Sequence, residues 1–373
     1  MVWMLAPRIQ SADSNLEYYY DYTQSQDELK RAFDELHQAW QWQWVTCDDF
    51  REVIDACVLR SGDVLPVFFN LCDGDDMNGV PGISVVKYLE EKKLCFTGAD
   101  SYFYEATTSK ITLKKLFEKH SVPTAPWEIL PADGSVVSGI FNRIGSPLII
   151  KPAVSAGSMG VTTQAVVSDE EALRNQLQRL SNGYHGWELA SGGIIAEAFI
   201  AGNEYTTFIT GHHLHPDQAK VYTPVERVFN NALPENEKFL SFERLWGMYA
   251  DETPLDEKEN LWEYELPDSG LIDEIKRISW DAYAASGGTG YGRVDLRRDK
   301  STGKMYVLEV NAQCGLSEDE NYTSIGAILR YCKLPFSHII REIIGHAIED
   351  TTSISNSPSS EVPLHKTNTT VAS

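Results

Sequence analysis

The most informative stretch of the sequence is Gly292-Arg293-Val294-Asp295-Leu296, followed by Tyr306-Val307-Leu308-Glu309-Val310-Asn311. Its polar residues alternate with apolar ones, and in a strand alternate side chains face the same way. Two adjacent strands would therefore bring the four polar side chains into one pocket. Carboxylate and amide oxygens suit Mg²⁺, which binds through a few carboxylates, waters and substrate phosphates. The pattern indicates nucleotide chemistry, although an ordinary hairpin with one solvated face shows the same alternation.

A second motif combines a lysine with a glycine-rich loop. The apolar run Pro147-Leu148-Ile149-Ile150 ends at Lys151, and Ser155-Ala156-Gly157-Ser158-Met159-Gly160 follows it. Small residues let backbone N–H groups wrap phosphate oxygens, and a lysine at the strand end adds a point charge for the same anion. The loop lacks the Gly-Lys-Ser/Thr ending of a P-loop, so it indicates a phosphate site of another kind.

A third motif covers Ile194 to Thr206 and is typical of a strand, a tight turn and another strand. Glu197 and Glu204 flank the turn, and a carboxylate is a good acceptor for paired ribose hydroxyls. The apolar link from Ala198 to Ile200 can hold a purine against backbone hydrogen-bonding groups. Taken singly, each of the three motifs is more often structural than functional.

In this order and spacing the motifs resemble the ATP-grasp superfamily, and within it the D-alanine–D-alanine ligase group, from about Val67 to about His346. The resemblance implies an α/β (α+β ATP-grasp) fold, in which an N-terminal α/β domain precedes a two-lobed module that holds ATP between its lobes. We expect the N-terminal domain at 1–106, the small subdomain at 107–190 and the large subdomain with the magnesium site at 191–348. A tail rich in Ser, Thr and Asn, at 349–373, is expected to be disordered.

The resemblance also implies roles for individual residues. Arg293 would stabilise the reacting phosphoryl and tetrahedral groups, while Asp295, Glu309 and Asn311 would hold Mg²⁺, with two ions expected and Mn²⁺ allowed. The ATP site would have four parts. Lys110 and Lys151 would bind the phosphates, and the glycine-rich flap, with Ser155, Gly157, Ser158 and Gly160, would cover the triphosphate. Glu197, Ala198, Phe199 and Ile200 would contact the adenine, and the Glu204 carboxylate would bind the ribose.

The segment 224–247 lies where the family has a mobile loop over its active site. Lys238 is the catalytic candidate for a phosphate contact from this loop, beside Lys151 and Arg293, and Arg244 is its rival. A solvated surface loop with assorted charges is the alternative interpretation.

The substrate positions depart from the family pattern. After Asn311 the family usually has Pro-Gly and then a serine that binds the second substrate's carboxylate, whereas this chain has Gly315 and, near the serine's position, Glu320. A glutamate would repel a carboxylate. The family's N-terminal acid has no evident match in Ala6–Asp13, and Gly157 replaces the first of two flap serines. D-alanyl-D-alanine is therefore not the expected product.

The implied activity is ATP-dependent formation of an amide or peptide bond between small carboxylate and amine substrates that resemble amino acids, through an acyl phosphate. A non-catalytic ATP-binding regulatory protein and a phosphotransferase with the same fold are the alternatives. The sequence does not identify the two substrates.

Composition limits the partners. The net charge of −22 argues against a nucleic-acid partner, and no apolar run is long enough for a membrane helix. The six cysteines lack metal-binding spacing and indicate free thiols in a reducing, cytoplasmic setting. The family resemblance allows a homodimer, which the sequence does not test. Aromatic residues at helical spacing between Leu29 and Trp44 predict an amphipathic helix.

Overall fold

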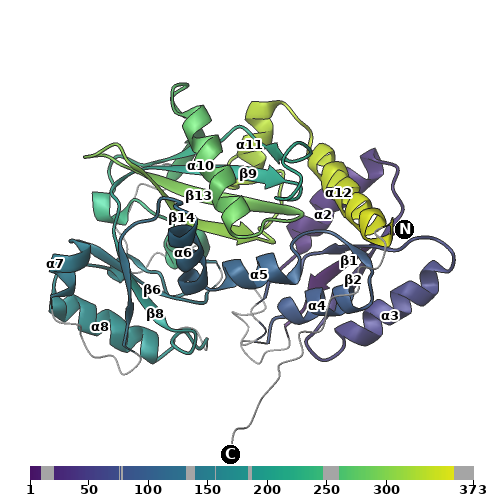
Figure 1. Ribbon diagram of the computed structural model, residues 1–373, viewed down its shortest axis with the longest axis horizontal. Helices are drawn as coiled ribbons and strands as arrows, with labels where there is room; N and C mark the ends of the chain where they lie inside the picture. The colour runs from purple at the N-terminus through teal and green to yellow at the C-terminus, as the bar shows by residue number, and fades with distance from the viewer. Residues whose placement is uncertain are drawn as a thin grey trace, which may run out of the picture.

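The computed structural model describes residues 1–356 apart from 10–20, 75, 77–78, 132–138, 156, 184–186 and 247–259. Part of the predicted N-terminal loop, Ala156 of the flap, Gly247 and the tail beyond Asn356 lie outside the described residues. The chain forms three sheets, which Figure 1 shows at the right (N-terminal), at the lower left (small) and across the top (large). Among the described residues, no helix has the length and apolar character needed to cross a membrane.

The N-terminal sheet is parallel and has the strand order β2-β1-β3-β4. Its elements are β1 (Val2–Pro7), α2 (Thr23–Glu35), β2 (Trp40–Val45), α3 (Phe50–Ser61), β3 (Val67–Asn70), α4 (Ile83–Glu91) and β4 (Cys95–Phe96). The helix predicted between Leu29 and Trp44 ends at Glu35, so this prediction was wrong for the residues after Glu35, where Trp40–Val45 form strand β2. Tryptophans there alternate with glutamines at the period of a strand, and Trp40 stacks on Phe33 of α2 with ring centroids 5.4 Å apart.

The C-terminal helix packs on this first sheet. Helix α12 (Phe336–Asn356) buries Ile339, Ile340 and Ile343 in a core that also contains Phe69 of β3. The helix continues beyond residue 348, where we placed the end of the large subdomain. The N-terminal domain is thus completed by the far end of the chain, as Figure 1 shows.

The small sheet is antiparallel, with the order β5-β8-β6-β7. Its elements are β5 (Trp127–Leu130), α7 (Ile140–Ile144), β6 (Leu148–Pro152), η1 (Thr163–Ala165), β7 (Val166–Val167), α8 (Glu170–Ser181) and β8 (Ile194–Ala198). Strand β8 pairs with both β5 and β6, so the chain leaves this lobe after Ala198 and not at residue 190, where we placed the boundary.

The large sheet has the order β12-β11-β9-β13-β14, with β10 paired to β9. Its strands are β9 (Gly202–Thr210), β10 (Lys220–Val221), β11 (Val225–Phe229), β12 (Trp262–Glu265), β13 (Tyr291–Asp299) and β14 (Met305–Ala312). The other elements of the module are α5 (Ser101–Thr108), α6 (Lys110–Lys119), η2 (Glu235–Glu237), α9 (Phe242–Trp246), α10 (Ile272–Ala285) and α11 (Ser324–Cys332). Helices α5, α6 and α10 share one buried core with β13 and β14.

Gln313 fastens the end of β14 to the N-terminal sheet. Its side-chain amide donates to the Asn70 carbonyl at 3.1 Å, and its side-chain oxygen accepts from the Ala99 N–H at 2.9 Å. A Cβ on Gly98 would lie 1.7 Å from that oxygen, and Gly98 has a φ of +94°. Only glycine fits this contact without strain, which gives the Thr97-Gly98-Ala99 stretch a structural role.

Candidate active site

The four polar side chains Arg293, Asp295, Glu309 and Asn311 lie on one face of the large sheet. Strands β13 and β14 are antiparallel, and their register sets Arg293 opposite Asn311 and Asp295 opposite Glu309. Directly opposite residues project to the same side of a sheet, so all four side chains share that face. The register shifts after Asp295, and such bulges often re-aim side chains beside active sites.

Hydrogen bonds join these side chains. Asp295 accepts from Nε and Nη2 of Arg293 at 3.0 and 2.9 Å and from the Thr206 hydroxyl at 2.8 Å. The Asn311 amide donates to Asp295 at 3.1 Å and to Glu309 at 3.2 Å. The two carboxylates are therefore held side by side and share one amide donor.

The charges around the two carboxylates differ. Burial raises the pKa of Asp295; Arg293 opposes the rise and the neighbouring Glu309 charge adds to it. Burial also acts to raise the pKa of Glu309, but Lys110, Arg293 and Lys151 outweigh it and hold that pKa below its usual value. Two adjacent carboxylates, one of them disfavoured as an anion, form a place that a divalent cation would stabilise.

The donor set fits Mg²⁺. Within the described part of the chain, no group of three or more His, Cys, Asp or Glu side chains could hold a metal ion. Mg²⁺ does not require such a cage, because it keeps waters and substrate phosphates among its ligands. Asp295, Glu309 and Asn311 would supply the partial set of oxygens that this ion uses.

The predicted phosphate-binding lysines come from two elements, α6 and β6. Lys110 begins α6 and donates to the Ser155 hydroxyl at 3.3 Å, and Lys151 of β6 pairs with Glu197 at 3.1 Å. Burial lowers the pKa of Lys110, Glu309 raises it and Lys151 lowers it. The charges of Lys151 on β6 and Glu309 on β14 therefore both act on the Lys110 ammonium group.

The flap backbone adopts left-handed conformations at three positions. Gly157, Ser158 and Gly160 have φ values of +54°, +60° and +77°, a conformation that glycine adopts readily and serine seldom does. The Ser158 hydroxyl donates to the Leu240 carbonyl at 3.1 Å, and the Phe242 N–H donates to the Val161 carbonyl at 3.0 Å. The flap is therefore attached to the loop 234–246 of the large lobe.

The predicted adenine segment links the two lobes. The N–H groups of Ala198 and Phe199 donate to the carbonyls of Pro126 and Pro147 at 2.9 and 3.0 Å. The Ile200 carbonyl accepts from Arg297 at 3.1 Å. The segment has a fixed backbone, which suits a purine contact, although two of its N–H groups are already used.

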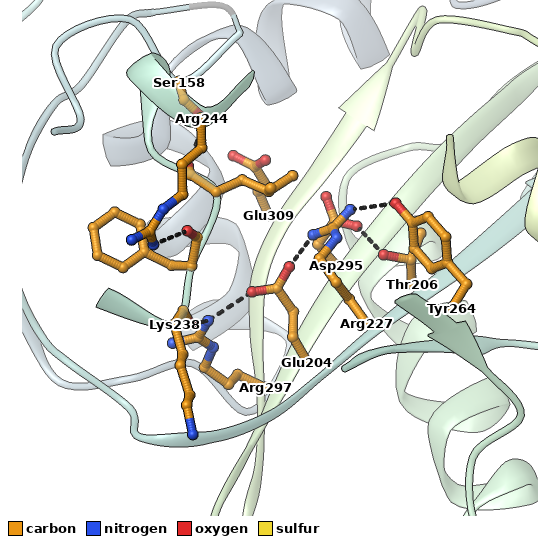
Figure 2. A network of polar contacts seen from close by, with 12 residues as sticks. Ser158, Glu204, Thr206, Arg227, Lys238, Arg244, Tyr264, Asp295, Arg297 and Glu309 are labelled. Carbon is orange, nitrogen blue, oxygen red and sulfur yellow. Dashed lines mark hydrogen bonds and ion pairs between the residues drawn. The ribbon is translucent and has the colours of Figure 1, made fainter. Parts of the chain in front are cut away.

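Glu204 lies between two buried arginines. It stands directly opposite Arg227 on β11 and Arg297 on β13. Arg227 pairs with one of its carboxylate oxygens and Arg297 with the other, the latter at 2.7 Å, as Figure 2 shows. Burial acts to raise the pKa of Glu204, but the two guanidinium groups hold it below its usual value. The expected ribose acceptor is thus an ionised carboxylate whose oxygens already have partners.

The two candidates on the loop 224–247 are engaged within that loop. Lys238 pairs with Glu235 at 2.6 Å, and Figure 2 shows its side chain directed away from Glu309 and Asp295. Arg244 is buried and pairs with Glu237 at 2.9 Å. The Lys238 ammonium group is therefore held by Glu235 and directed away from the magnesium residues, and its phosphate contact stays a prediction.

The predicted substrate residues follow β14. Gly315 is exposed, and a Cβ there would meet nothing within 4 Å. Glu320 is exposed in the turn before α11. Glu28 of α2 holds this loop, because its buried carboxylate accepts from the Ser317 hydroxyl at 3.0 Å and the Glu318 N–H at 3.1 Å. The N-terminal domain therefore contributes an acidic residue, Glu28, to the loop after β14. This residue lies in α2, later in the chain than Ala6–Asp13, where we expected the family's acid.

Sequence reasoning missed four charged residues of this region, namely Glu28, Lys114, Arg227 and Arg297. Lys114 lies one helical turn after Lys110 and binds Glu197 at 2.6 Å, so the spacing of the two lysines was a usable signal. The arginines carried no local signal, because their meeting with Glu204 depends on the pairing of three strands that are distant in sequence.

The family of the chain follows from its sequence. Residues 116–344 match the family described as D-ala D-ala ligase C-terminus. The chain belongs to this family. The ligase is accordingly an ATP-dependent enzyme that joins a carboxylate to an amine, and the predicted resemblance is confirmed.

Relatives of the ligase carry the same family name. The D-alanine–D-alanine ligase of Xanthomonas axonopodis pv. citri is 29% identical over 255 residues, which cover 67% of this chain and 69% of that protein. The D-alanine–D-alanine ligase B of Xanthomonas campestris pv. campestris is 27% identical over 294 residues, which cover 73% of this chain and 81% of that protein.

Solved structures confirm the predicted α/β ATP-grasp fold. The D-alanine–D-alanine ligase of Bacillus anthracis, solved with ATP, has a TM-score of 0.65 at 16% identity, over 95% of this chain and 99% of that chain. The Coxiella burnetii ligase has a TM-score of 0.62 at 14% identity, over 95% of this chain and 96% of that chain. At these identities the likeness concerns the fold.

Proposed function

We propose that the ligase uses Mg-ATP to join the carboxylate of one amino-acid-like substrate to the amine of a second, through an acyl phosphate. The meeting of Lys110, Lys151 and Glu309 supports this proposal, since Lys110 donates to Ser155 of the flap at 3.3 Å and both lysines lower the pKa of the Glu309 carboxyl on β14. The cations proposed to bind phosphate therefore act electrostatically on an oxygen group proposed to bind magnesium.

The proposed chemistry has two steps. A carboxylate oxygen attacks the γ-phosphorus of ATP and ADP leaves; the amine then attacks the acyl carbon, phosphate leaves and the nitrogen loses a proton. Phosphoryl transfer leaves a protein little covalent work, so positioning and charge stabilisation dominate. When bound, Mg²⁺ would act as a Lewis acid on the phosphates.

The residues have separate tasks in this proposal. Lys110 and Lys151 bind the phosphates, and the flap backbone covers them. Arg293, whose side chain is 27% exposed, stabilises the charge that develops on the transferred phosphoryl group. The segment 197–200 would hold the adenine. Asp295, Glu309 and Asn311 would hold the magnesium, and one or two ions are compatible with this donor set.

We further propose that the second substrate carries no carboxylate next to its amine. The loop after Gly315 has three consecutive acids. Arg31 neutralises Glu318 at 2.5 Å, Asp319 accepts two backbone N–H groups, and Glu320 is exposed. Glu320 would repel a substrate carboxylate. The names of the relatives make D-alanine the reference substrate against which this proposal is tested.

The experiment incubates the ligase with Mg-ATP and either D-alanine alone or D-alanine with a panel of amines, including polyamines and amino-acid amides. Mass spectrometry identifies the product, and ADP and phosphate are quantified. A condensation product that is lost in Lys151→Ala and Glu309→Gln supports the ligase. D-alanyl-D-alanine as the preferred product would refute the substrate proposal alone. A phosphorylated acid without amide would identify a phosphotransferase.

A further inference from the structure

The large sheet has a second polar cavity on the face opposite the magnesium residues. Its volume is about 350 Å³, which is within the roughly 300–1,000 Å³ of small-molecule pockets. The polar residues that line it are Asn203 and Tyr205 of β9, Glu226 of β11, Arg298 of β13 and Asp268, which precedes α10. Successive residues of a strand face opposite sides of a sheet. Glu204, Arg227 and Arg297, which Figure 2 shows beside Asp295, therefore face away from this cavity.

Arg298 supplies a cation that the described part of the chain leaves unpaired. Its guanidinium makes no hydrogen bond or ion pair with another described residue, and its Nε is buried. A buried donor without a partner destabilises a fold, so such a group calls for an explanation. A guanidinium with free donors suits a carboxylate, which it binds through two parallel hydrogen bonds.

The Tyr205 hydroxyl is a second donor for the same ligand group. Tyr205 is 2% exposed, and burial, with the Glu226 charge, raises its pKa to about 12 although the Arg298 charge opposes the rise. The hydroxyl therefore keeps its proton at neutral pH. It has no hydrogen-bond partner among the residues that the structure describes. A carboxylate in the cavity could accept from both Arg298 and Tyr205.

Glu226 supplies the opposite charge. It stands directly opposite Tyr205, whereas Arg298 stands opposite Asn203, so β9 separates the two charged residues. Neighbouring strands are about 4.8 Å apart, so roughly 10 Å separates the backbones of β11 and β13. Burial raises the pKa of Glu226, and the Asn203 amide, which donates to the carboxylate, opposes the rise. No described cation pairs with Glu226, and Asp268 adds a second, exposed acid.

We propose that this cavity binds a small zwitterion of the amino-acid or dipeptide class, with its carboxylate on Arg298 and Tyr205 and its ammonium group on Glu226. The two charged side chains do not pair with each other, and a molecule that carries both charges would bridge them. The site is separate from the ATP and substrate sites. It does not depend on the proposed function, because its chemistry follows from its own residues.

A ligand-observed NMR titration of the full-length protein, with Mg²⁺ and without nucleotide, tests the proposal. The probes are the common L-amino acids, D-alanine and D-alanyl-D-alanine. The tightest binder is compared with its amide, which lacks the carboxylate, and with the acid that lacks its amino group. Both analogues should bind at least about tenfold more weakly, because each loses a charge-assisted hydrogen bond. An amide that binds as tightly as its parent, or no detectable binding of any probe, overturns the proposal.

Variants assign the binding to this cavity. Arg298→Met and Glu226→Gln should each weaken the tightest binder at least about tenfold. Arg277→Met, at an exposed arginine of α10 that pairs with Asp281, is the control and should leave the affinity unchanged. Thermal unfolding checks that each variant folds, and Arg298→Lys, which keeps the charge but not the two parallel donors, replaces Arg298→Met if that variant does not fold. Unchanged affinity in both cavity variants would place the binding elsewhere and overturn the proposal.

Discussion

Two buried carboxylates stand at the ends of the turn between β8 and β9, and each is held by two cations. Glu197 binds Lys114 at 2.6 Å and Lys151 at 3.1 Å. This lysine cluster is open on one side, because the Lys151 side chain is 15% exposed whereas that of Lys114 is 2% exposed. One cation is fixed and the other can meet a ligand.

The second cluster is closed. The arginine cluster holds Glu204 between Arg227 and Arg297, whose side chains are 7% and 4% exposed. Burial costs a guanidinium less than an ammonium group, because it is more weakly hydrated and donates to several acceptors at once. The lysine cluster is therefore suited to binding phosphate and the arginine cluster to joining segments. Each prediction below tests this contrast.

The largest effect is expected from Glu204→Gln. The substitution leaves two buried guanidinium groups without a carboxylate, and removing one partner of a buried ion pair costs about 3–5 kcal/mol. Urea denaturation should show this loss in the free energy of unfolding. Glu235→Gln, at an exposed pair, should change it by less than about 1 kcal/mol. Equal effects of the two variants would contradict a closed, structural cluster.

Lys151→Met should act on turnover and leave stability nearly intact. We expect the rate of ADP release to fall about 10²- to 10³-fold, as for the loss of one pre-organised group that stabilises transition-state charge. The free energy of unfolding should change little, because Glu197 retains Lys114. Lys115→Met, at an exposed lysine of α6, is the control. Loss of stability without loss of turnover would make Lys151 a structural residue.

Lys114→Met should give a smaller effect of a different kind. Without Lys114, the Glu197 charge draws the Lys151 ammonium group away from the phosphates, so the KM for ATP should rise about tenfold, which corresponds to about 1.4 kcal/mol. Initial rates at varied ATP concentration measure this effect. A fall in kcat at unchanged KM would show that Lys114 acts on the chemical step.

Acidification should produce the smallest effect. For Glu204 in the folded protein, burial acts to raise the pKa and the two arginines lower it below the ordinary 4.5, with a net lowering. A lowered pKa contributes stability that is fully present above the unfolded value and is lost as the pH falls through the folded value. The stability difference between wild type and Glu204→Gln should therefore narrow below about pH 4.5, which urea titrations at several pH values can measure. A constant difference would mean that the pKa of Glu204 is the same in the folded and the unfolded protein.

Local patterns predicted much of this molecule. The alternation around Asp295 and Glu309 predicted the β13–β14 pair, and the run ending at Lys151 predicted β6. The same rule of period two could have identified β2, where we instead followed helical spacing through Trp40. Such predictions succeed when all the residues involved are neighbours in the chain or in one hairpin.

The family, the ATP-grasp fold and the residues around which the magnesium site is proposed could all be inferred from the sequence, because they depend on motif order and on strands adjacent in sequence. Three features came from the folded molecule: Glu204 is enclosed, Lys238 is directed away from the magnesium residues, and Glu28 supports the loop after β14. Each of these outcomes depends on a contact between distant segments. Burial and charge then determine which of the side chains brought together remain accessible to a ligand.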